Sequence, residues 1–153
     1  LREPFSELQA AYQGKVALNL ASENMLDSLF EERLNKNDLL SIGKGGRHLL
    51  VETSCFNPQM GLQSILLRIK TKCYFPILPP PERYLYMAES DYQQQKPMNM
   101  IQLNQFSLLG LYGKEVKKRV QTLRSLEMYD YVGTDLHRLD TLIRVICCKE
   151  LVK

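Results

Sequence analysis

Asp135 and His137 lie two residues apart near the C-terminal end of the sequence. A carboxylate and an imidazole at this spacing, in a loop that follows a strand, can both bind one metal ion. Glu52 is the natural third ligand, because it ends the apolar segment 49–52, where an unpaired charge is costly unless water, a cation or a donor meets it. A motif this short also occurs by chance, and an aspartate after a strand often caps the next helix, so both interpretations stay open.

Other charged residues follow segments that are expected to be strands. Glu23 comes after the apolar segment 15–20, and Glu82 and Arg83 follow the third expected strand in a proline-rich loop. The carboxyl ends of parallel strands gather functional groups on one rim, so we expect these side chains to lie near the aspartate and the histidine. Glu23 has a second interpretation, as an acid in the first turn of a helix. His48, at a strand entrance, is expected on the surface, away from the rim.

Three other motifs lack the context that their chemistry needs. The glycine-rich segment 43–46 precedes an expected strand instead of joining a strand to a helix, which predicts a turn and not a phosphate-binding loop. The basic run 114–119 has an apolar side, so its charges are expected to face water. No cysteine follows a phosphate-binding loop and no serine occupies a nucleophile elbow, so covalent catalysis is not expected.

Short β-rich segments alternate with longer segments of helical period, a pattern typical of βαβ units and a parallel sheet. We predict five such units, with strands covered on both faces. Three apolar helical stripes are expected to pack onto the sheet. The predicted strands are 15–20, 48–53, 74–78, 100–103 and 129–133, and the stripes are Leu62, Ile65, Leu66 and Ile69, then Val116, Val120, Leu123 and Leu126, then Leu139, Leu142, Ile143 and Ile146.

The 153 residues are 44% hydrophobic, which predicts one globular domain over residues 1–153. The net charge of +3 is spread along the chain and argues against a nucleic-acid partner. The apolar stretches are too short for a membrane span, and the four cysteines fit no zinc or redox spacing, so we expect reduced thiols and a cytoplasmic protein. A closed barrel needs roughly 200 residues, so five units that begin at Leu1 predict an incomplete barrel without its N-terminal strands.

Four segments occur in one order along the chain: ASENMLD at 21–27, HLLVE at 48–52, PERY at 81–84 and GTDLH at 133–137. Together they resemble motifs of the bacterial capsular-polysaccharide tyrosine-protein phosphatases of the PHP superfamily. Each motif is short, but the set in this order is much more specific, and the resemblance covers almost the whole chain.

The resemblance implies a distorted (β/α)7 TIM-like barrel around divalent metal ions, with manganese as the expected metal. It implies that Glu23, Glu52, Asp135 and His137 bind metal and that Arg83 holds the phosphoryl oxygens. The implied reaction is metal-dependent hydrolysis of phosphotyrosine in capsule and exopolysaccharide biosynthesis. The implied partner is the phosphotyrosine tail of a bacterial tyrosine autokinase, and homo-oligomerisation is left open.

The sequence also departs from the family pattern. No counterpart of the family's His-x-His pair is found, and Pro80 stands where the family has a metal-binding histidine. We therefore expect a weak metal site and impaired activity. Two alternatives remain: a non-catalytic remnant, or pseudoenzyme, that keeps the scaffold, and a PHP phosphoesterase that acts on a small phosphorylated metabolite.

Overall fold

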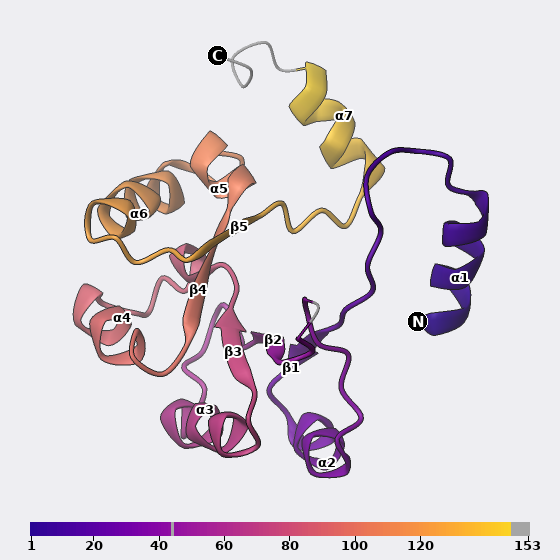
Figure 1. The fold of residues 1–153 in the computed structure, drawn as a ribbon. Coiled ribbons are helices and arrows are strands. Elements are labelled where there is room, and N and C mark those ends of the chain that lie inside the picture. The colour runs from indigo at the N-terminus through magenta and orange to yellow at the C-terminus, as the bar shows by residue number, and fades with distance from the viewer. Residues whose placement is uncertain (44, 148–153) are drawn as a thin grey trace.

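A single parallel sheet of five strands organises the computed structural model, which describes residues 1–43 and 45–147 (Figure 1). The strands are β1 (Glu23–Met25), β2 (His48–Glu52), β3 (Phe75–Leu78), β4 (Met100–Asn104) and β5 (Tyr131–Gly133). Their spatial order follows the sequence order, and every neighbouring pair is parallel. This is the order of a (β/α) barrel, whereas a doubly wound sheet reverses its order at a switch point. The predicted α/β class with five parallel strands is confirmed.

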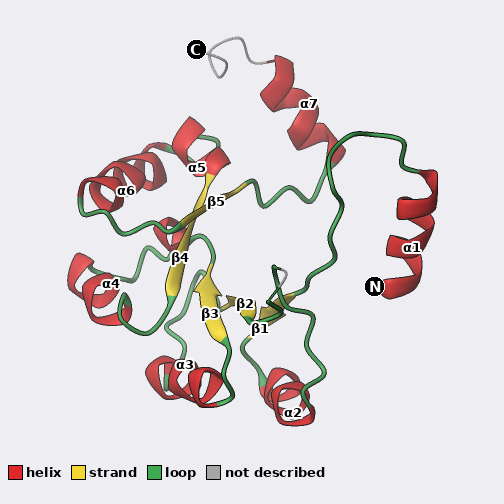
Figure 2. Ribbon diagram, viewed as in Figure 1, coloured by secondary structure: helices red, strands yellow, loops and turns green. Residues whose placement is uncertain are grey.

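A helical segment follows each strand (Figure 2). Helices α2, α3, α4 and α6 surround the strands, while α1 and α7 extend away from them. The helical segments are α1 (Arg2–Ala11), α2 (Ser28–Lys36), α3 (Leu62–Thr71), the 3-10 turn η1 (Pro81–Arg83), α4 (Glu89–Gln95), α5 (Gln105–Leu109), α6 (Lys114–Ser125) and α7 (Leu139–Cys147).

Buried and half-buried side chains alternate along β2, and this distinguishes the two faces of the sheet. Leu49 and Val51 have no exposed surface and belong to the same core cluster as Leu66 and Ile69 of α3. Side chains alternate along a strand, so His48, Leu50 and Glu52 point to the opposite, inner face. Glu23 pairs with Leu50 in the parallel register and therefore shares this inner face.

The inner face is concave, as the ring contacts of His48 demonstrate. The His48 ring lies 5.6 Å from the ring of Phe75 on β3 and 6.3 Å from that of Tyr131 on β5. Because β5 is three strands away from β2 in the sheet, the second contact requires the sheet to curl. His48 begins β2, as predicted, and is half-buried in this aromatic group rather than fully exposed.

The first predicted strand was wrong. Residues 15–20 form no strand, and Val16 is 70% exposed. The edge of the sheet is occupied instead by the polar strand β1, which Asn24 fixes by donating from its buried side chain to the carbonyls of Ser22 and Leu50. These hydrogen bonds, one of them to the neighbouring strand β2, rather than an apolar run, select this strand.

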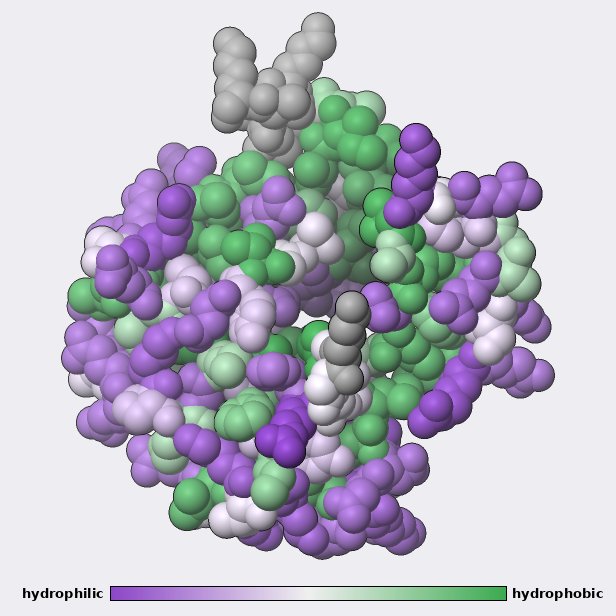
Figure 3. Space-filling model, in the orientation of Figure 1, coloured by the Kyte–Doolittle hydropathy of each residue, from purple (hydrophilic) through white to green (hydrophobic). Residues whose placement is uncertain are grey.

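The apolar stripe of α7 does not pack onto the sheet, contrary to the prediction. Leu139, Ile143 and Ile146 are 71%, 52% and 67% exposed, and Figure 3 shows apolar side chains at the surface there. The stripe of α3 does cover the sheet, through Leu66 and Ile69. The stripe of α6 buries Val116, Val120 and Leu123, whereas Leu126 is 37% exposed.

Two smaller predictions had different outcomes. The glycine-rich segment forms a turn, with the Gly46 amide donating to the Gly43 carbonyl at 3.1 Å, although residue 44 lies outside the described part. The basic run of α6 does not face water throughout, because Arg119 donates to the carbonyls of Tyr84 and Met87. No helix among the described residues is long and apolar enough to cross a membrane.

Candidate metal centre

Glu23, Asp135 and His137 converge on the inner side of the curled sheet. Each offers one ligand atom, and the three atoms lie within 4.8 Å of one another. His137 Nε2 is 2.7 Å from Asp135 Oδ1. Glu23 comes from β1 and the other two from the loop after β5, so the curvature brings opposite edges of the sheet to one place.

Glu23 begins β1 instead of following a strand. It also lies outside the first turn of α2, whose acidic residue is Glu31, so the interpretation as a helix-terminal acid was wrong. The inner-face position of Glu23 is fixed by its register opposite Leu50.

Asp135 occupies a left-handed backbone conformation, with φ at +51°. Its carboxylate does not cap a helix among the described contacts. Oδ2 accepts from Arg83 Nη1 at 3.1 Å and from Asn104 Nδ2 at 3.2 Å, while Oδ1 faces His137. The two oxygens therefore have different partners.

Glu52 ends β2 on the same inner face, opposite Met25 of β1. It lies outside the group of three that can share one ion, although it is close enough for its charge to act on Glu23. The structure thus gathers three of the four residues predicted as ligands and places the fourth beside them.

The electrostatics of the group suit a cation. Partial burial raises the pKa of the Glu23 carboxyl, and the negative charges of Glu52 and Asp135 raise it further, while His137 and Arg83 act in the opposite direction. Neighbouring carboxylates that repel one another are stabilised by a positive ion between them. Two carboxylates and one imidazole form a donor set that divalent transition metals accept, so the residues present fit a metal ion.

Arg83 lies beside this group. Besides its ion pair with Asp135, its guanidinium carbon stands 4.9 Å from the ring centroid of Tyr112. Its side chain is 31% exposed, so its remaining donors can reach a ligand. A planar guanidinium suits the oxygens of a phosphoryl group.

Two residues of the site were missed by sequence reasoning. Asn104 ends β4, and the strand-end rule applied to Glu52 would have found it. Tyr112 follows α5, and nothing in its local pattern indicates a contact with Arg83. Pro80 is buried at the start of η1 and offers no side-chain donor atom.

Comparisons with known proteins match both the sequence and the fold. The model of the family described as "Capsular polysaccharide synthesis, CpsB/CapC" matches residues 2–147. A chain from the crystal structures of YwqE from Bacillus subtilis and CpsB from Streptococcus pneumoniae, described as unique metal-dependent tyrosine phosphatases, superposes with a TM-score of 0.77. The superposition covers 91% of this chain at 20% identity and 57% of that chain, so it establishes a shared fold over part of the longer protein. No curated protein matches by sequence.

Proposed function

The chain belongs to the CpsB/CapC family of capsular polysaccharide synthesis, and we propose from this that it serves as a metal-dependent protein-tyrosine phosphatase. The observation that carries the proposal is the convergence of Glu23, Asp135 and His137 within 4.8 Å, with Arg83 bonded to the same aspartate. Metal-assisted hydrolysis of a phosphomonoester uses such a ligand group beside a side chain that holds the phosphoryl oxygens.

Each residue has a distinct task in this proposal. Glu23, Asp135 and His137 hold a divalent cation, and Glu52 adds negative charge beside them. Manganese is the expected metal by family resemblance, and the carboxylate and imidazole donors are compatible with it. The bound ion would supply charge neutralisation and lower the pKa of a water molecule. Arg83 holds the phosphoryl oxygens through its fork of N–H donors.

The proposed substrate is the phosphotyrosine tail of a bacterial tyrosine autokinase, in the cytoplasm. A single domain over residues 1–153 carries the site in this proposal. We expect this chain to turn over slowly by itself, because three ligand atoms gather among the described residues and Pro80 adds none. Fewer ligands bind an ion less tightly and orient it less well.

Release of phosphate from a phosphotyrosine peptide, with Mn²⁺ and with a chelator, tests the proposal. Slow, Mn²⁺-dependent release is expected, and Asp135→Asn should abolish it, because the amide has a neutral oxygen where the carboxylate is charged. Release that persists in the chelator would contradict the metal mechanism. No release under any condition would favour the non-catalytic remnant, and faster release from a sugar phosphate would favour the metabolite phosphoesterase.

A further inference from the structure

A fully buried glutamate lies next to the phosphate-binding arginine. Glu82 has no exposed surface, and its carboxylate accepts from the backbone N–H of Asn104 and from the hydroxyl of Tyr129, both at 3.1 Å. No lysine or arginine among the described residues forms an ion pair with it. A buried carboxylate without an ion-pair partner is costly, so we asked which residues Glu82 holds in place.

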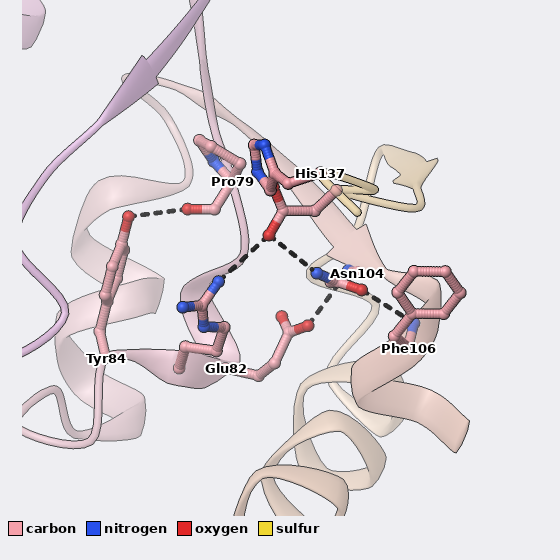
Figure 4. Close-up of polar contacts among 8 residues, drawn as sticks. Pro79, Glu82, Tyr84, Asn104, Phe106 and His137 are labelled. Carbon is pink, nitrogen blue, oxygen red and sulfur yellow. Dashed lines mark hydrogen bonds and ion pairs between the residues drawn. The ribbon is translucent and has the colours of Figure 1, made fainter. Parts of the chain in front are cut away.

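Glu82 holds Asn104 at the carboxyl end of β4. Asn104 has no exposed surface, and its Oδ1 accepts from the backbone N–H of Phe106 at 2.8 Å, which caps α5. This bond fixes the orientation of the amide, because exchanging oxygen and nitrogen would place two donors together. Nδ2 then points to Asp135, to which it donates at 3.2 Å. Figure 4 shows Asn104 with its neighbours Glu82 and Phe106.

We propose that Asn104 is a positioning residue for the metal centre, an inference that rests on the proposed function. Its Nδ2 holds Oδ2 of Asp135, which leaves Oδ1 facing His137. Glu23 adds a ligand atom within 4.8 Å of those of Asp135 and His137. Glu82 acts through it by fixing the backbone from which the amide projects.

Arg83 contacts the same oxygen of Asp135 but cannot replace Asn104. The arginine side chain is partly exposed, so a phosphoryl group can compete with the aspartate for its donors. Asn104 has no exposed surface and no second orientation, so it keeps its hydrogen bond when Arg83 engages substrate. The aspartate therefore stays in place while a ligand is bound.

The test is the affinity of the chain for Mn²⁺, measured by calorimetry, together with thermal unfolding. Asn104→Ser keeps a residue type that caps helices and removes the donor to Asp135. Polar partners of metal ligands are typically worth about 10–100-fold in affinity, and a loss of that size is expected with little change in unfolding temperature. Asp91→Ala is the control, because it removes a hydrogen bond to the Ala88 amide at the start of α4 without touching Asp135.

Each outcome is decisive. A loss of Mn²⁺ affinity in Asn104→Ser but not in Asp91→Ala supports the positioning role. If Asn104→Ser binds Mn²⁺ as tightly as the parent chain, the positioning role is overturned and the proposed function still stands. The same conclusion follows if Asp91→Ala loses as much Mn²⁺ affinity as Asn104→Ser. Failure of the parent chain to bind Mn²⁺ overturns the metal centre itself and this inference with it.

Discussion

The guanidinium of Arg83 lies over the ring of Tyr112, with 4.9 Å between its carbon and the ring centroid. Such a contact is worth roughly 0.5–1 kcal/mol at a partly exposed position. Tyr112 thus supports one face of the residue to which we assign phosphoryl binding, while Asp135 holds one of its nitrogens.

Tyr112→Ala should weaken binding of a phosphotyrosine peptide by about 2–5-fold, because the loss of the ring frees the guanidinium. Tyr112→Phe keeps the ring and should bind like the parent chain. Titration of the peptide into each variant measures the effect. Equal affinity for the alanine and phenylalanine variants would show that the ring does not support Arg83.

Glu82 should give the protein a stability that depends on pH. Burial raises the pKa of this carboxyl above its ordinary value. The folded state then holds this proton to higher pH than the unfolded state. The contribution of Glu82 to the free energy of unfolding is therefore fully present below about pH 4.3 and is lost as pH rises through the raised pKa.

Glu82→Gln should flatten that decline, because the amide has a similar volume and does not titrate. The free energy of unfolding in urea, measured at a series of pH values, gives the comparison. Glu3→Gln on α1 serves as the exposed control and should leave the decline unchanged. Parallel curves for the Glu82 variant and the parent chain would contradict the assignment.

Mn²⁺ should raise the unfolding temperature. An ion at ten times its dissociation constant contributes about 1.4 kcal/mol, or roughly 3–6 °C for a chain of this size. His137→Ala should remove the shift. His48→Ala is the matched control, since it lowers the unfolding temperature by disturbing the rings of Phe75 and Tyr131 but should keep the shift. A shift retained in His137→Ala would place the ion elsewhere.

The core between β2 and α3 should dominate stability. Leu66 has no exposed surface, so Leu66→Ala should lower the free energy of unfolding by about 2–5 kcal/mol. Ile143 on α7 is 52% exposed, and Ile143→Ser should change the free energy of unfolding by no more than about 0.5 kcal/mol. Denaturant titrations of both variants check this, and a large loss in the α7 variant would mean that the helix packs in solution.

The parts of the fold that could be predicted from the sequence are those in which local pattern and tertiary environment agree. The segment 48–52 alternates buried and half-buried residues as a strand should, and α3 buries the stripe that its period indicates. By contrast, β1 is polar, and its Asn24 side chain donates to the Leu50 carbonyl of β2, a contact that no local pattern contains.

The residues of the candidate site could likewise be predicted in part from the sequence. The strand-end rule predicts from the sequence that Glu23, Glu52, Asp135 and His137 share one rim. Only the curvature of the sheet decides that Glu23 joins Asp135 and His137 while Glu52 stays beside them. Asn104 also ends a strand, and it was missed because the rule was applied to charged side chains and not to amides.

The left-handed backbone at Asp135 limits which amino acids can replace it, whether or not the carboxylate binds a metal ion. Most side chains are strained at φ +51°, whereas aspartate, asparagine and glycine tolerate it. An alanine scan would therefore confound conformational cost with loss of charge at this residue. Asparagine separates the two, and the same constraint limits which homologous sequences can keep this loop after discarding its carboxylate.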